Sequence, residues 1–356
     1  MRSGIWFCLA MSCGGATPGA PPIPQPGGHD QPTPAPYVPP DLQPVTAPPQ
    51  TVLGHAQECA QVLGPIPGFD CLTDADPVPV TRDGVPQTTQ NPSTCDRPSL
   101  LEGSCNIWTR AGAKQGTWSD GSPRPEVTFV FTCRSSDDQA PTDEGGEYHD
   151  VAMIGHNRDT GATCFFQSFP DGRVRYFPSP MTAGSGAPDY GEVDALQVWD
   201  PPAETASIEC HRCHNADPWI HSPWIDQMPS RALPEEPMVP WTELGSAYHV
   251  AGTEFAYWAE ELAYFDIPGN PCLSCHRIGV AGCDEFVAYS AGDPTWLPLD
   301  GDTYGQVWMP PDFAGTQDDW ERVWRPAVTE IRACCDAPGL PGCNVTATPA
   351  GQVYVP

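Results

Sequence analysis

Two short stretches of the chain carry the same arrangement of thiols and imidazole. One reads CHRCH from Cys210 to His214, and the other reads CLSCH from Cys272 to His276. The residues inside the stretches differ, so the shared pattern is Cys-x-x-Cys-His. Such paired thiols can close a disulfide, bind a metal ion or be alkylated, and the histidine adds a neutral metal ligand. The repeated order indicates one bound group held by all three side chains of each stretch.

The motif resembles the haem attachment sequence of the c-type cytochrome family, in which both cysteines form thioethers and the histidine binds the iron. The resemblance covers roughly residues 204–345 and rests on the two short motifs. It implies two covalently attached haem c groups. The implied attachment residues are Cys210, Cys213, Cys272 and Cys275, and the implied iron ligands are His214 and His276.

Three other chemistries use pairs of cysteines. A zinc ribbon needs its two pairs about 15–20 residues apart, whereas Cys272 lies 62 positions after Cys210. Zinc also gives no reason for the adjacent histidine. A thioredoxin-like redox pair needs a strand before a helix, which neither stretch shows, and plain disulfides are the remaining alternative. The haem interpretation accounts for the cysteines and the histidine together.

The second ligand of an iron sets much of a haem's chemistry. For the second haem, the stretch QVWMPPDFAG offers Met309, 33 residues after His276. Its position before prolines and a terminal helix is similar to the distal Met-Pro loop of single-haem cytochromes c. A thioether ligand raises the reduction potential relative to two histidines. The alternative is an ordinary core methionine beside Trp308.

Several residues compete as the distal ligand of the first haem. His221 lies seven residues after His214, and His156 could come from the preceding part of the chain. An isolated histidine is more often structural than a ligand, so the choice stays open. His211, inside the motif, is expected at the surface. The further candidates are His249, Met228 and Met238.

The remaining cysteines indicate an oxidising compartment. Of 16 cysteines, two lie near the N-terminus and four in the motifs, which leaves ten. An even remainder of this size predicts five disulfides, as in exported proteins. These ten are Cys59, Cys71, Cys95, Cys105, Cys133, Cys164, Cys283, Cys334, Cys335 and Cys343.

The N-terminal sequence MRSGIWFCLAMSCGG, residues 1–13 above all, resembles a short bacterial lipoprotein signal. The resemblance implies export to the periplasm or cell surface and lipidation of Cys13. Residues 14–52 follow as a proline-rich linker without a packable core. No stretch of the sequence reaches the length of a transmembrane helix.

Residues 53–203 are expected to form a β-rich, disulfide-stapled domain. EVTFVFTC (126–133) and DVAMIGHN (150–157) have the composition of strands. GATCFFQSF and GRVRYFPSP follow on either side of Pro170-Asp171-Gly172, which predicts a hairpin.

Residues 204–345 are expected to form short helices joined by loops, because three stretches have apolar residues at helical spacing. The stretches are ETASIECHRCH, GTEFAYWAEELAYF and DDWERVWRPAVTEIRACC. Residues 346–356 form a tail. The predicted fold class is therefore α+β, a disulfide-rich β domain followed by a mainly α, loop-rich cytochrome c-like di-haem domain.

The chain is strongly acidic, with 45 acidic and 16 basic residues and a formal net charge of −29. This charge disfavours nucleic acid and anionic membranes and favours redox partners with basic surfaces. The sequence shows no nucleophile motif, phosphate loop or catalytic constellation. We expect an exported di-haem carrier of single electrons. A haem-containing sensor or binding module and a di-haem peroxidase-like enzyme are the alternatives.

Overall fold

The structure is a computed structural model, and its described residues all belong to one compact unit, Pro39–Pro356. The N-terminal segment 1–13 and most of the 14–52 linker lie outside the described residues. The described residues are 45–82, 85–87, 107–134, 148–170, 174–184, 193–220, 228, 237–242, 246–274, 277–284, 287, 318 and 320–348.

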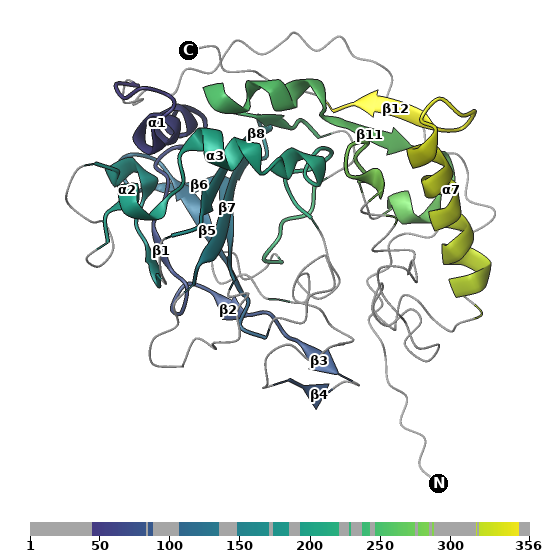
Figure 1. Cartoon of the computed structure of the whole chain (residues 1–356), viewed down its shortest axis with the longest axis horizontal. Helices are drawn as coiled ribbons and strands as arrows, with labels where there is room; N and C mark the ends of the chain where they lie inside the picture. Colours follow the sequence, from purple (N-terminus) through teal and green to yellow (C-terminus); the bar gives the residue numbers. More distant parts are fainter. Residues whose placement is uncertain are drawn as a thin grey trace. The chain divides into compact units, whose positions relative to one another are not determined.

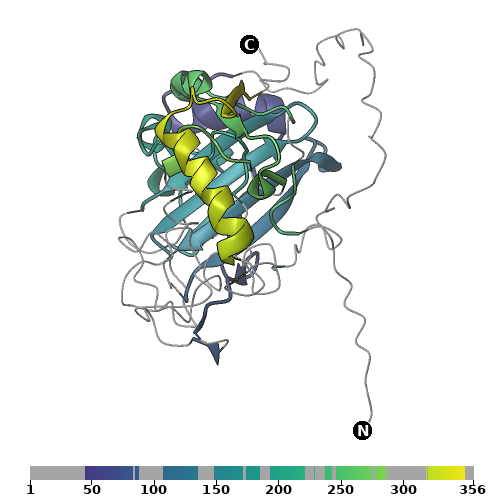
Figure 2. The same cartoon turned by 90° about the vertical axis from the view of Figure 1, so that its right-hand side faces the viewer.

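A six-stranded sheet in the order β10-β8-β7-β6-β5-β2 forms the centre of this unit (Figures 1 and 2). Neighbouring strands are antiparallel except β10 and β8, which are parallel. The predicted strands at 126–133 and 150–157 are confirmed as parts of this sheet. The strands are β2 (Asp76–Pro77), β5 (Arg110–Thr117), β6 (Pro123–Arg134), β7 (Asp150–Asn157), β8 (Ala162–Ser168) and β10 (His249–Val250).

One face of the sheet packs against helix α1 (Val52–Leu63), which begins where the side chain of Thr51 accepts a hydrogen bond from the Gly54 amide. Alternate β6 residues, including Phe129 and Phe131, lie in this core. Alternation is expected because successive strand side chains point to opposite faces. The sequence did not predict α1, which begins at the last residue of the expected linker and continues into the expected β-rich region.

The opposite face of the sheet packs against the part of the chain that carries the first motif. Val130 and Ala113 contact a cluster that contains Trp219, and Phe165 contacts one that contains Trp258. Both faces are therefore covered, which explains why every residue of β8 is buried. The polar residues at the end of β8 are buried because they are bonded: Ser168 donates to the Val198 carbonyl and Gln167 to Asp150.

The predicted hairpin between GATCFFQSF and GRVRYFPSP is wrong. The second stretch provides only the short strand β9 (Tyr176–Phe177), which pairs with β1 (Phe69–Asp70) and not with β8. An ion pair from Arg175 to the buried carboxylate of Asp70, at 2.8 Å, holds this arrangement. Asp171 and Gly172 of the proposed turn lie outside the described residues. Turn composition alone could not reveal this competing long-range partner.

The region after residue 204 is less helical than predicted. The terminal helix is confirmed as the π-helical turn η6 (Trp320–Trp324) followed by α7 (Arg325–Asp336). The stretch GTEFAYWAEELAYF is only partly helical, because it forms a 3-10 helix η3 (Thr253–Glu260) and then strand β11 (Ala263–Asp266). Strand β11 pairs with β12 (Asn344–Ala347), so the stretch changes from helix to strand where that partner is available.

The remaining elements are short. The division between the two predicted domains at residue 204 stays a prediction, although β10 of the second region adds an edge strand to the sheet of the first. The elements not yet named are β3 (Thr81–Arg82), β4 (Val85–Pro86), η1 (Pro180–Thr182), α2 (Ala195–Val198), α3 (Pro202–Ser207), η2 (Cys210–Arg212) and η4 (Pro271–Ser274).

Eight of the ten cysteines predicted to form disulfides do so, while Cys95 and Cys105 lie outside the described residues. The pairs are Cys59–Cys164, Cys71–Cys133, Cys283–Cys335 and Cys334–Cys343, and none of these four disulfides uses a motif cysteine.

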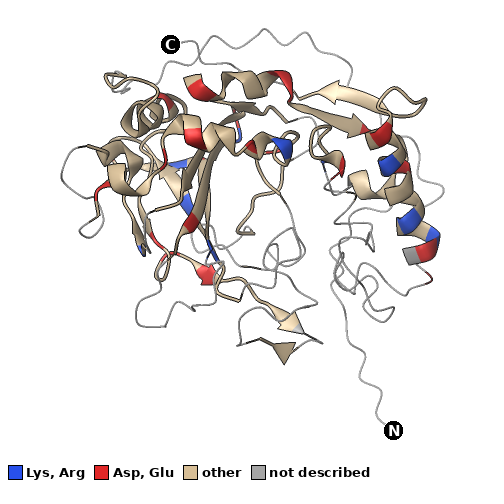
Figure 3. Cartoon of the chain, viewed as in Figure 1, with Lys and Arg blue, Asp and Glu red and all other residues tan. Residues whose placement is uncertain are grey.

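Among the described residues, no helix has the length and apolar character needed to span a membrane. Asp and Glu are more frequent than Lys and Arg among the described residues, and their positions are spread over many elements (Figure 3).

Candidate functional site

The first motif forms one tight turn of chain. The 3-10 helix η2 covers Cys210–Arg212, and the amide of His214 donates to the Cys210 carbonyl at 2.8 Å. The turn is entered through Glu209, whose φ of 58° lies in the left-handed region. A non-glycine residue there costs about 1–2 kcal/mol. The backbone therefore brings the two cysteines and the histidine of this motif together at an energetic cost.

The His214 side chain is held in one tautomer. Its Nδ1 lies 3.0 Å from the Pro218 carbonyl oxygen, which can only accept, so Nδ1 carries the hydrogen and Nε2 keeps its lone pair. Burial lowers the pKa of His214 to about 4, although the Pro218 hydrogen bond opposes this shift. The imidazole is therefore neutral at pH 7. Metal-binding histidines are commonly oriented by such a carbonyl bond on the second nitrogen.

The motif cysteines differ in their surroundings. Cys210 is half-buried against the Phe165 and Trp258 cluster, Cys213 is exposed and Cys272 is buried. Burial raises the pKa of the Cys210 thiol to about 11. A thiol that stays protonated at neutral pH is a poor redox nucleophile. This environment disfavours the thioredoxin-like alternative at the first motif.

The second motif is described only as far as Ser274, and Cys275 and His276 lie outside the described residues. Asn270 holds its first turn, η4, against helix α7. The Asn270 Oδ1 accepts from the Cys272 amide at 3.0 Å, and its Nδ2 donates to the Ala327 carbonyl at 2.9 Å and to Glu330 at 2.8 Å. The terminal helix thus positions the second motif.

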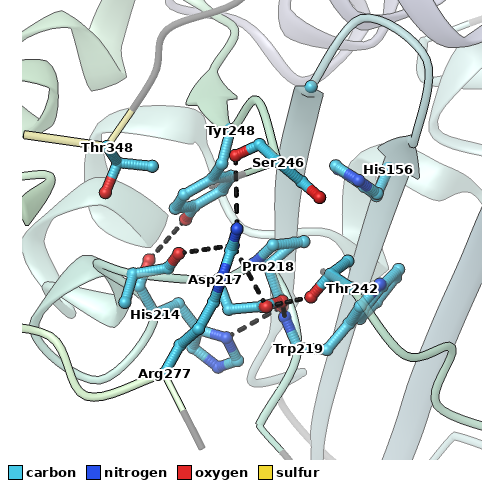
Figure 4. A network of polar contacts seen from close by, with 12 residues as sticks. His156, His214, Asp217, Pro218, Trp219, Thr242, Ser246, Tyr248, Arg277 and Thr348 are labelled. Carbon is cyan, nitrogen blue, oxygen red and sulfur yellow. Dashed lines mark hydrogen bonds and ion pairs between the residues drawn. The ribbon is translucent and has the colours of Figure 1, made fainter. Parts of the chain in front are cut away.

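The residue that follows the second motif reaches the loop that follows the first. Arg277 Nη1 donates to the Ala216 carbonyl at 2.8 Å and lies 3.2 Å from Asp217 Oδ2 (Figure 4). Arg277 Nη2 lies 3.3 Å from the Ser246 carbonyl. The hydroxyl of buried Tyr248 donates to the His214 carbonyl. These bonds join the chain around one motif to the chain around the other.

His156, a candidate distal ligand, is buried on β7 beside Trp219, with ring centroids 5.8 Å apart. Its Nδ1 lies 2.8 Å from the Thr163 hydroxyl, which itself donates to the Gly161 carbonyl. His156 Nδ1 is therefore the donor, and Nε2 keeps a lone pair. Burial, reinforced by nearby His249 and Arg277, lowers the pKa of His156 to about 3. The ring is a neutral potential ligand.

The other ligand candidates fall into two groups. Met228 and Met238 are buried in the cluster around Trp219, and His249 is buried on β10. His221 and Met309 lie outside the described residues, so their roles stay predictions. The structure therefore brings His156, Met228 and Met238 to Trp219, which is five residues after His214.

His211 was expected at the surface, and this prediction is wrong. The side chain is 1 % exposed and stacks on Trp258 with ring centroids 4.6 Å apart. Its Nε2 lies 2.8 Å from Glu261 Oε2. The tight 3-10 turn directs His211 onto η3, whereas spacing along the motif suggested an outward direction.

Several supporting residues were not identified from the sequence. Pro218 bonds a residue close in sequence, Asn270 bonds both a near neighbour and helix α7, and Arg277 bonds residues far away in sequence. The position of Arg277 directly after a motif was visible, but its partners around residue 217 were not.

Searches against protein-family models, curated proteins and solved structures find no match to this chain.

Proposed function

We propose that the chain is an exported di-haem c-type cytochrome that passes single electrons between redox proteins. One observation carries the proposal: within the Cys-x-x-Cys-His turn, His214 is a neutral imidazole whose Nδ1 is fixed by the Pro218 carbonyl. Its remaining nitrogen is in the form that binds iron. Two of the alternatives, zinc and a thiol redox pair, need no such histidine.

The surroundings of the motif fit a covalently bound porphyrin. Haem would supply one-electron chemistry at its iron, with Cys210 and Cys213 holding the ring and His214 binding the metal. Both amide atoms of Asn215 and the indole nitrogen of Trp219 are buried without a hydrogen-bond partner among the described residues. Each such group costs about 1–3 kcal/mol. A bound group with acceptor oxygens, such as haem propionates, would satisfy the two donors.

The protein around the first motif can both exclude water and admit a partner. The sheet face and Trp258 cover Cys210, whereas Cys213 is exposed. A ring held by both cysteines would therefore be shielded on one side and close to solvent on the other. Four exposed carboxylates and one arginine occupy the neighbouring chain, which favours a basic partner. They are Glu204, Glu209, Glu260, Glu261 and Arg212.

The oxidising compartment required for this proposal is supported by the four disulfides, which are typical of exported proteins. The second haem rests on the sequence of its motif and on the placement of Cys272 by Asn270. Met309 and His276 complete its proposed ligand set. His156, His221, His249, Met228 and Met238 remain the proposed alternatives for the distal position of the first haem.

Mass and optical spectra test the proposal. Protein produced in the periplasm of a host with haem attachment machinery should exceed the polypeptide mass by two haems after acid-acetone extraction. Its pyridine haemochrome spectrum should report two thioether-linked haems. The pair Cys210→Ala and Cys213→Ala should remove one haem and leave the other. A mass that fits the polypeptide plus zinc would end the cytochrome interpretation.

Two histidine variants separate ligation from packing at the first motif. His214→Ala should make one haem high-spin or water-ligated, because its proximal ligand is lost. His211→Gln changes the other histidine of the same turn, which stacks on Trp258 and binds no iron in this proposal. It should leave the spectrum of both haems unchanged. The same spectrum for His214→Ala and wild type would argue against the proposed ligand.

A further inference from the structure

We propose that Arg277 is the positioning residue that fixes the two haems in one arrangement, so that electrons pass between them within the chain. This inference rests on the proposed function. The transfer is a single-electron exchange in which one haem iron is oxidised from ferrous to ferric and the other is reduced, with no bond made or broken. The role assigned to Arg277 and Asp217 is to set the separation and the electrostatic interaction of the two centres.

The first step of the argument is the position of Arg277. It follows directly after His276, the implied iron ligand of the second haem. Its guanidinium binds the carbonyl of Ala216 and the carboxylate of Asp217, two and three residues after His214. A third contact reaches the Ser246 carbonyl. One side chain thus connects the chain next to both implied iron ligands.

The Asp217 carboxylate is itself held in place. Its Oδ1 accepts from the Trp219 amide at 2.9 Å, and its Oδ2 accepts from the Thr242 hydroxyl (Figure 4). The Arg277 and Asp217 side chains are 5 % and 8 % exposed. Removing one member of a buried ion pair leaves an uncompensated charge, so the pair resists separation. The planar fork of arginine binds several acceptors at once, which lysine cannot reproduce.

Close backbone packing supports the same contact. A methyl group at Gly279 would overlap the amide of Asn215, and one at Gly282 would overlap the Arg212 carbonyl. Glycine is needed where chain segments approach this closely. The segment 277–282 therefore lies directly against residues 212–217, and it does so at three points. Haems attached through the two motifs would be neighbours.

Neighbouring haems interact, and this interaction is measurable. Oxidising one iron adds a positive charge that makes oxidation of the other harder, because charges in a low-dielectric interior are poorly screened. In a redox titration, the midpoint potential of each haem should therefore depend on the oxidation state of the other, which widens the gap between the two reduction steps. Dipolar broadening between the two ferric centres is expected in the electron paramagnetic resonance spectrum. Loss of the Arg277 contacts should weaken both signals.

The test first counts haems in the wild-type protein, because fewer than two would reject the proposed function rather than this inference. With two haems present, Arg277→Gln and Arg277→Lys should each narrow the gap between the two reduction steps and reduce the dipolar broadening. Asp217→Asn keeps the size of the side chain and should act in the same direction. The double variant Arg277→Gln/Asp217→Asn should be less altered than the sum of the single variants.

The control is the Arg175–Asp70 ion pair, which holds β9 against β1. Arg175→Gln breaks a comparable contact without touching the motifs. It should lower stability and leave the redox steps and the dipolar broadening unchanged. Two haems that titrate independently in the wild type would overturn the inference. Wild-type redox steps and wild-type broadening in Arg277→Gln would also overturn it. If Arg277→Gln does not accumulate, the same result in Asp217→Asn would do so.

Discussion

At the residue scale, burial keeps His214 and His156 neutral at pH 7, and one hydrogen bond fixes the tautomer of each ring. His214 donates from Nδ1 to a carbonyl, and His156 donates from Nδ1 to a hydroxyl that is already committed as a donor. Both rings therefore keep an Nε2 lone pair. His55 differs, because its Nε2 lies 3.0 Å from the Phe165 carbonyl. That contact uses the nitrogen that the other two rings leave available.

His55 should make stability depend on pH. Burial lowers its pKa from 6.5 to about 4, so between these values the unfolded state binds more protons than the folded state. The free energy of unfolding should fall as the pH is lowered from 6.5 to 4, by about 1.4 kcal/mol per pH unit for one such group. The slope of the free energy of unfolding against pH, measured by urea unfolding, should differ between wild type and His55→Gln by the equivalent of about one proton over this range. Above pH 7.5 the slopes should coincide, which serves as the control. An unchanged slope in the acidic range would refute the prediction.

Gly279→Ala tests the close packing between the two motif loops. The added methyl group would overlap the fully buried Asn215 amide, so we expect a loss of about 1–3 kcal/mol in the free energy of unfolding. Gly339→Ala is the matched control, because no atom lies within 4 Å of its added methyl group. The double variant Gly279→Ala/Asn215→Ala should recover part of the loss. Equal stability of the two glycine variants would contradict this packing.

At the element scale, the sheet packs against α1 on one face and against the chain of the first motif on the other. The second motif packs against α7 instead. The two faces of the sheet serve different purposes. One is fastened to α1 by the Cys59–Cys164 disulfide, and the other receives Trp219 and Trp258. The second motif instead joins a separate core with Phe265, Val328 and Ile331.

Asn270→Ala tests the attachment of the second motif to α7. The substitution removes one bond to the Cys272 amide and two bonds to α7, which should lower the free energy of unfolding by about 1–3 kcal/mol. Hydrogen exchange should speed up in α7 more than in the sheet. Thr329→Ala removes only an exposed hydroxyl that bonds within α7, so it serves as the control. Equal exchange in the two variants would show that Asn270 does not hold the helix.

The elements that the sequence predicted well are those whose own apolar residues show the spacing typical of a strand or a helix. Strands β6 and β7 have apolar, β-branched or aromatic residues at their cores, and α7 has a clear stripe through Ala327, Val328 and Ile331. Strand β5 was missed because RAGAKQGT has neither a clear apolar–polar alternation nor any large apolar residue. Its pairing with β6 supplies the stability that its own sequence lacks.

The candidate site could be predicted from the sequence only where it is local. The stretch ETASIECHRCH was expected to be helical, and it contains α3 and η2, whose bonds run between near neighbours such as His214 and Cys210. The burial of His211 depends on Trp258, 47 residues later in the chain, and Arg277 depends on Asp217. Such partners are chosen by the tertiary fold, and spacing within a motif contains no information about them.

At the scale of the whole molecule, covalent cross-links offset a large repulsive charge. A net charge of −29 favours expanded states through self-repulsion. Each disulfide opposes expansion by restricting the unfolded chain, and removing one from a small exported domain typically costs about 2–5 kcal/mol. The effect of the disulfides on stability should therefore be greatest at low salt, where charges are least screened.

Alkylation of the unfolded protein tests the oxidised state of the whole set. Without reductant, no label should appear on the eight cysteines that form the four disulfides, nor on Cys95 and Cys105, for which the fifth disulfide is predicted. After reduction, all ten should be labelled, as counted by mass spectrometry of peptides. Labelling of four or more without reductant would argue for a reducing compartment or for a further metal site.

The positions of the four disulfides along the chain have a consequence for maturation. The disulfides Cys59–Cys164 and Cys71–Cys133 close nested loops that end at Cys164. The disulfides Cys283–Cys335 and Cys334–Cys343 close overlapping loops that begin at Cys283. Both motifs lie in the interval 165–282, which none of these four disulfides encloses. Unfolding of this interval therefore does not require reduction of any of these four disulfides. Under the proposed function, a haem attachment enzyme would reach the motif thiols after oxidation of the flanks, with these four disulfides left intact.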